Sequence, residues 1–76
     1  MPKQNFIDVR KRIFLVLRIL FGDLRSATDR KMVLYYENRL RSYISAYYLV
    51  DILTEKEYNN LYKTATQLSD KMLHSF

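Results

Sequence analysis

The sequence has no cysteine, no tryptophan, one glycine and one proline among its 76 residues. The lack of cysteine excludes disulfides and thiolate metal sites. A single glycine excludes the glycine-rich loops that hold nucleotide phosphates. So few turn-forming residues also disfavour an all-β fold, because such a fold needs many turns. A helical fold without a covalent staple is therefore expected.

Catalytic residues are also scarce. The only histidine, His74, lies two residues from the end of the chain, and no nucleophile and base can be paired with it. Glu55 and Glu57, two residues apart, look like a carboxylate pair, but the start of a helix accounts for both. We expect a non-enzymatic protein with no catalytic residue, no cofactor and no metal site.

Hydrophobic residues make up 49% of the chain, which is far from a disordered composition. A chain of this size forms one domain, residues 1–76, and buries only about 60% of the surface that it exposes when unfolded. Small domains of this kind depend on good helix packing or on a second subunit. The expected fold is all-α, a small three-helix domain that self-associates.

The first helix is expected from Asn5, which can cap it, to Phe21, with Gly22 ending it. From residue 13 to residue 21 it is apolar on almost every side, and this favours cover from a second copy. Arg18 interrupts the apolar run, either paired with an acid or with its head in water. The residues that we assign to self-association are Phe14, Arg18, Phe21 and, on the second helix, Tyr48.

This apolar run is too short for a membrane anchor. It has nine residues, from 13 to 21, against the ~20 that a membrane-spanning helix needs. No small-residue cleavage site follows it, as a signal peptide would require. We expect a cytoplasmic protein, with membrane binding disfavoured.

The second helix is expected over residues 27–53, with a weak capping pattern at Ser26 and Asp29 and room for a kink near residues 41–42. The third has a clear start, because Thr54 and Glu57 form a T-x-x-E capping box. The connection between these helices is then one to three residues long. So short a connection predicts an antiparallel helix 2–helix 3 hairpin at residues 50–57.

Charge is divided unevenly along the chain. Residues 1–41 hold ten Lys and Arg against four acids, a net charge of +6, whereas residues 42–76 have a net charge of −1. Such a chain suggests an acidic partner for its first half. An ordinary solvated surface with local ion pairs, such as Glu37 with Arg41, is the simpler alternative. The candidate residues for partner or nucleic-acid binding are Arg10, Lys11, Arg12, Arg30, Lys31, Tyr35, Arg39 and Arg41.

Two functions fit these observations. The first is a small, basic helical regulator that forms a homo-oligomer, most simply a dimer, and docks on a protein partner through apolar and aromatic helix faces. The alternative is a nucleic-acid-binding regulator that uses the basic residues of 1–41, with tyrosine as a stacking residue. The first is favoured because the chain has more apolar surface than its length can bury.

Overall fold

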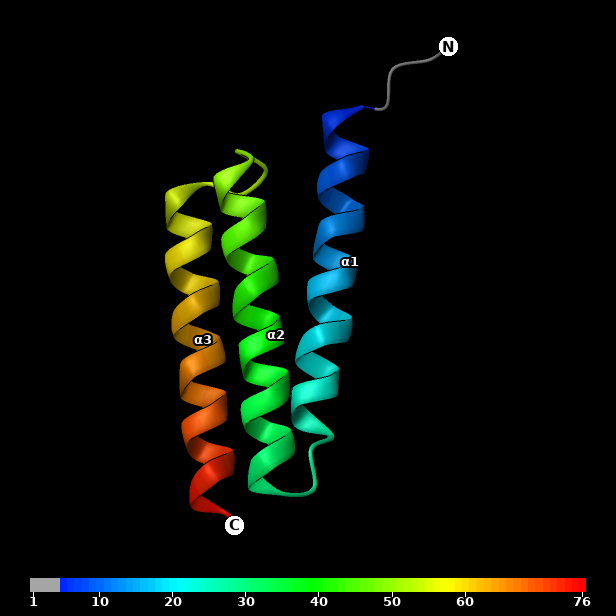
Figure 1. The fold of residues 1–76 in the computed structure, drawn as a ribbon. Helices are drawn as coiled ribbons and strands as arrows, with labels where there is room; N and C mark the ends of the chain where they lie inside the picture. Colours follow the sequence, from blue (N-terminus) through cyan, green and yellow to red (C-terminus); the bar gives the residue numbers. More distant parts are fainter. Residues whose placement is uncertain (1–4) are drawn as a thin grey trace.

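The computed structural model describes residues 5–76 and contains three helices of equal length (Figure 1). They are α1, Phe6–Arg25; α2, Arg30–Leu49; and α3, Glu55–His74. Residues 5–76 contain no β-strand. The predicted all-α, three-helix fold is confirmed.

The start of α1 is as expected, but its end is not. The Asn5 side chain accepts a hydrogen bond from the backbone N–H of Ile7 at 2.9 Å. The helix continues through Gly22 to Arg25, so the prediction that Gly22 ends it was wrong. Leu24, in the extra turn, is completely buried. Burying a leucine contributes about 1.5–3 kcal/mol, which exceeds the cost of about 1 kcal/mol for glycine inside a helix.

The bounds of α2 also differ from the prediction. Asp29 is the N-cap, and its carboxylate accepts from the Met32 N–H at 2.7 Å. The helix is continuous through residues 41–42 and ends at Leu49. Asp51 then adopts a left-handed conformation with φ of 61°. The N–H of Ile52 bonds the carbonyl of Tyr47, and that of Asp51 bonds the carbonyl of Tyr48, as in a Schellman motif.

The third helix begins as predicted. The Thr54 hydroxyl accepts from the Glu57 N–H at 3.1 Å, and the Glu57 carboxylate accepts from the Thr54 N–H at 2.9 Å. Both halves of the capping box are therefore present. The connection from α2 occupies residues 50–54, longer than expected because α2 ends earlier. Figure 1 shows α2 and α3 side by side and antiparallel, which confirms the hairpin.

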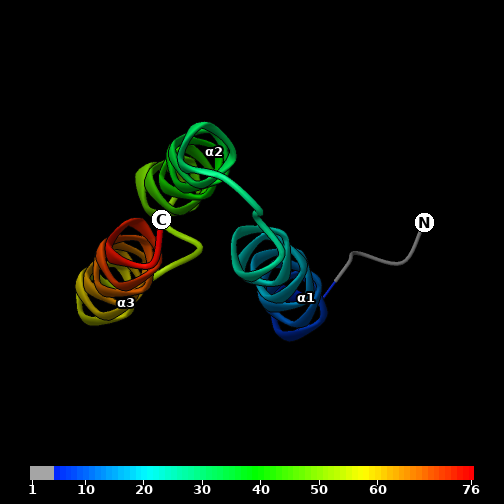
Figure 2. The ribbon, with the colours of Figure 1, turned by 90° about the horizontal axis from the view of Figure 1, so that it is seen from below.

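The core lies along α2, with α1 on one side of it and α3 on the other (Figure 2). Val33, Leu40 and Ile44 of α2 are completely buried. On α3, the small residues Ala65 and Ser69 are also completely buried, which allows α2 and α3 to pack closely over their whole length. The molecule is elongated, 49 × 22 × 13 Å, because the helices are nearly aligned.

Helix α1 is only half covered by the rest of the molecule. Its buried residues, Leu17, Leu20, Phe21 and Leu24, all lie in the C-terminal half. Its N-terminal end diverges from α2 and α3 in Figure 1, and α1 packs much less against α3 than against α2. Phe6, at the start of α1, is 56% exposed for this reason.

Candidate interaction surface

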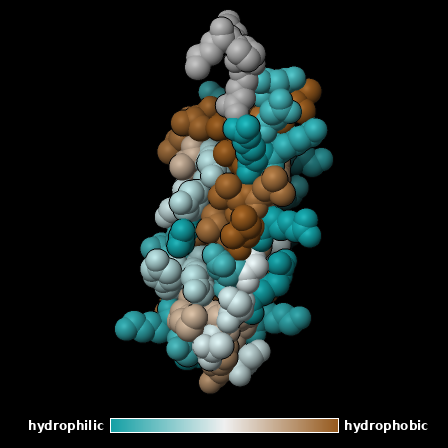
Figure 3. All heavy atoms as spheres, turned by 90° about the vertical axis from the view of Figure 1, so that its right-hand side faces the viewer, coloured by the Kyte–Doolittle hydropathy of each residue, from teal (hydrophilic) through white to brown (hydrophobic). Residues whose placement is uncertain are grey.

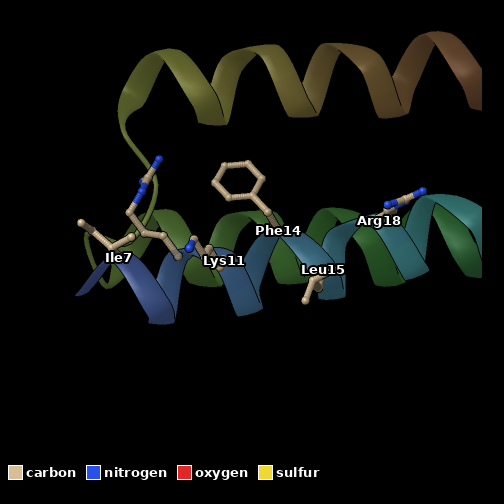
Figure 4. Close-up of a pocket in the computed structure, with 6 residues that line it drawn as sticks. Ile7, Lys11, Phe14, Leu15 and Arg18 are labelled. Atoms are coloured by element: carbon tan, nitrogen blue, oxygen red, sulfur yellow. The ribbon is translucent and has the colours of Figure 1, made fainter. Parts of the chain in front are cut away.

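One side of α1 carries a surface hollow of about 580 Å³. The residues that line it all belong to α1 and are Ile7, Arg10, Lys11, Phe14, Leu15 and Arg18. We call this set the α1 face. Figure 4 shows Phe14 pointing toward α3 and Leu15 pointing away from it, with Lys11 and Arg18 along the same helix.

The spacing of these residues explains why they share one side. Seven residues make almost two turns of an α-helix, so Ile7 and Phe14 lie in one row and Lys11 and Arg18 in another. Ile7 is 59% exposed and Leu15 57%, whereas Phe14, nearer α3, is 37% exposed. The face therefore alternates exposed apolar and cationic side chains.

Arg10, at the edge of this face, is held by the rest of the molecule. Its guanidinium forms two hydrogen bonds to the Glu57 carboxylate and donates a third to the Ile52 carbonyl at 2.7 Å. It also lies 5.9 Å from the Phe6 ring centre and 5.4 Å from that of Phe14. Arg10 thus fastens the N-terminal half of α1 to the start of α3.

The same contact changes the acidity of Glu57. Hydrogen bonds from Arg10, and next from the Thr54 backbone, lower the pKa of the Glu57 carboxyl to about 2. Both favour the charged carboxylate over the neutral acid. Glu57 therefore serves the α3 cap and the α1–α3 contact with one charged group.

Three other predicted binding residues are also engaged within the chain. Arg41 forms the predicted ion pair with Glu37 at 3.1 Å and donates to the Thr66 hydroxyl at 2.7 Å. Arg30 donates to the Leu73 carbonyl at 3.0 Å. Hydrogen bonding to the Tyr43 hydroxyl raises the pKa of Arg39. These contacts use guanidinium N–H groups that would otherwise be available to bind the phosphates of a polyanion.

The predicted cationic residues are divided between α1 and α2. Arg10 faces the start of α3, and Arg41 faces its middle through Thr66. Lys11, Arg12 and Lys31 are exposed, on two different helices. Tyr35 is 60% exposed and packs edge-on against Tyr36, with 5.4 Å between ring centres. Lys3, another base of the first half, lies outside the described residues.

The residues assigned to self-association are also divided. Phe14 and Arg18 belong to the α1 face. Arg18 forms no ion pair with another residue of 5–76. Phe21 is 8% exposed and belongs to the core. Tyr48 stacks on Tyr58 between α2 and α3, with 4.4 Å between ring centres. These four residues do not form a single interface.

Sequence reasoning missed two residues of the α1 face, Ile7 and Leu15. The spacing of Ile7 and Phe14, seven residues apart, was a usable signal. It could not show which apolar strip would be buried, because several sides of this helix are apolar.

Three further observations on the described residues concern metal binding, the histidine and membrane spanning. Between residues 5 and 76, no group of three or more His, Cys, Asp or Glu residues is placed to hold a metal ion. His74 contacts the Asp70 carbonyl through Nδ1 at 2.7 Å. In the same range, no helix has the length and hydrophobicity needed to cross a bilayer.

Comparisons with protein-family models, with curated proteins and with solved structures find no match to this chain.

Proposed function

We propose that this protein is a non-catalytic interaction module that docks on a protein partner through the α1 face. One observation carries the proposal. None of residues 6–16 is fully buried, yet this half of α1 carries exposed Phe6, Ile7, Phe14 and Leu15. Single exposed apolar residues are normal on a protein surface, but a group on one helix marks a binding site.

The surface view supports this interpretation. Figure 3, seen from the side of the molecule on which α1 lies, shows hydrophobic patches bordered by hydrophilic side chains. Helix-in-groove and helix-on-helix contacts use this arrangement, with an apolar centre and a polar rim. A protein partner would cover the apolar side chains that α2 and α3 leave exposed.

Self-association is the second part of the proposal. Leu15 and Ile19, one turn apart, form an outer strip of α1 in which Ile19 is 64% exposed. By helical spacing, this strip is bordered by charges of both signs, Asp8, Arg12 and Asp23. Mixed charge at its border allows two copies to meet without like charges facing each other.

Nucleic-acid binding has less support as an alternative. Arg10, Arg30, Arg39 and Arg41 are engaged within the chain, and the remaining bases are spread over different helices. A polyanion gains affinity from cations that can contact its phosphates together. The exposed Lys11 and Lys31 keep this alternative open to a direct test.

Site-specific photo-crosslinking in the native cell tests the proposal. A photoreactive amino acid at Leu15 should give an adduct with a protein other than a second 9.2 kDa copy, recognised by its mass, whereas the same group at exposed Asn59 of α3 should not. Equal labelling at both positions, or no protein adduct at Leu15, would contradict docking through α1. Nucleic acid in the adduct would instead favour the alternative function.

A further inference from the structure

We infer that the partner of the α1 face is an amphipathic helix with acidic residues beside its apolar stripe. This inference rests on the proposed function and adds the chemistry of the partner. It depends on two rows of side chains along the same side of α1.

The first row is apolar and the second is cationic. Ile7 and Phe14 are seven residues apart, as are Lys11, Arg18 and Arg25. A seven-residue step falls only about 20° short of two turns, so each series stays on one side over the length of α1. The cationic row therefore begins beside the apolar row, with Lys11 between Ile7 and Phe14 along the chain, and continues along the same side of α1 beyond Phe14.

No acid balances these cations on the face. The residues that line the hollow include three bases, Arg10, Lys11 and Arg18, and no Asp or Glu. Arg10 is neutralised by Glu57, but Lys11 and Arg18 are exposed and form no ion pair within residues 5–76. Asp8, seven residues before Leu15, lies at the outer edge of the face and does not line the hollow. The face is thus complementary to negative charge.

The length and shape of the face fit a helix. From Ile7 to Arg18 the axis rises about 17 Å, which is three turns. A hollow lined by residues at spacings of three, four and seven accepts the side-chain ridge of a second helix. Acidic residues beside that ridge would lie opposite Lys11 and Arg18.

A second copy fits this face less well. Two copies joined through it would bring their Lys11 and Arg18 rows together, and like charges across an interface are unfavourable. The outer strip of Leu15 and Ile19 offers a better surface for self-association. The cationic row is the feature that favours an acidic partner over a second copy.

The test uses a designed helical peptide of three heptads with Leu at the first and fourth positions of each heptad and Glu at the flanking positions. A control peptide carries Gln in place of Glu. Fluorescence anisotropy measures the binding of each labelled peptide to the full chain. We expect the acidic peptide to bind the parent about tenfold more tightly than it binds Lys11→Glu/Arg18→Glu.

A matched variant controls for net charge. Lys56→Glu/Lys63→Glu changes the charge equally, at exposed α3 positions that are also seven residues apart. It should leave the binding of the acidic peptide within about twofold of the parent, since neither lysine lines the hollow. Leu15→Ala should weaken both peptides, because it removes apolar contact from the face. Circular dichroism of each variant verifies that the helices are retained.

Three results would overturn the inference. One is equal binding of the acidic peptide to the parent and to the Lys11/Arg18 variant, even when Leu15 crosslinks to a protein; this would leave the proposed function standing. A second is binding of the parent to anionic phosphatidylserine vesicles but not to the peptide. A third is stronger self-association in the Lys11/Arg18 variant, since relief of like-charge repulsion would assign the face to a second copy.

Discussion

At the scale of single residues, Glu57 links α3 to a distant part of the chain. Its carboxylate accepts from the Thr54 N–H and from the Arg10 guanidinium, 47 residues away. Its pKa is lowered to about 2, so the folded state favours the ionised form more than the unfolded state does. The stabilisation from Glu57 is therefore present above pH about 4.5 and is lost as the pH falls toward 2.

The variant Glu57→Gln should be less stable than the parent at pH 7, and this difference should shrink between pH 4.5 and pH 2. Urea denaturation at a series of pH values measures both effects. The control is Glu55→Gln in the same helical turn, which lacks the contact with Arg10. A difference between parent and Glu57→Gln that stays constant across this pH range would contradict the assigned ionic role. Burial raises the pKa of Glu37, so the contribution of Glu37 to stability changes with pH in the opposite direction to that of Glu57. This contribution is the same in the parent and in Glu57→Gln, and it therefore cancels when the two proteins are compared.

Gly22 lies inside α1, and its surroundings are open. Apart from its chain neighbours and the backbone of its own helix, a Cβ atom at this position would meet no atom of the described residues within 4 Å, and the φ of Gly22 is not positive. Gly22→Ala should raise the free energy of unfolding by about 0.5–1 kcal/mol, because alanine loses less backbone entropy in a helix.

Thermal or urea denaturation measures the change. Ala46→Gly, at an exposed position inside α2, makes the reverse substitution and should lower stability by a similar amount. A destabilised Gly22→Ala protein would mean that α1 ends at Gly22 after all.

At the scale of the helices, local sequence and tertiary burial act differently at each end. Thr54 begins α3 by hydrogen bonds that span only three residues. The ends of α1 and α2 depend instead on the burial of Leu24 and on the left-handed Asp51. Local patterns therefore predicted the start of α3 well and the ends of α1 and α2 poorly.

Loss of the Thr54 hydroxyl should destabilise the protein by about 1 kcal/mol, because the Glu57 N–H loses its partner at the helix start. Thr54→Ala is compared with Thr64→Ala, whose hydroxyl bonds the Asn60 carbonyl on the exposed side of α3. The control should change stability by less than about 0.5 kcal/mol. If the two substitutions lower the free energy of unfolding equally in chemical denaturation, the Thr54 hydroxyl does not stabilise α3 as a cap.

At the scale of the whole molecule, the main feature is incomplete cover of α1. Helices α2 and α3 pack together over their length, whereas α1 diverges from them at its N-terminal end (Figure 1). They leave Ile7, Leu15 and Ile19 of α1 more than half exposed. Under the proposed function, a second protein surface would cover these side chains.

We expect the protein to sediment as a dimer or larger species at micromolar concentration rather than as a 9.2 kDa monomer. Ile19→Glu should shift it toward the monomer, because a charge would enter the apolar outer strip. Sedimentation equilibrium measures the mass, and Lys63→Glu on exposed α3 serves as the control. If the parent protein has a mass of 9.2 kDa at high concentration, self-association is disproved. Docking on other proteins would still be tested by the crosslinking experiment.

The sequence by itself determined the helical class, the Thr54 cap, the α2–α3 hairpin and the Glu37–Arg41 pair. Each depends on residues close together in the chain, so helical spacing and capping chemistry are enough to predict it. Only the tertiary structure decided that α1 continues past Gly22 and that Arg10 faces Glu57. It also decided which apolar strip of α1 remains exposed, because burial and distant ion pairs depend on how the helices pack and not on the period of any one helix.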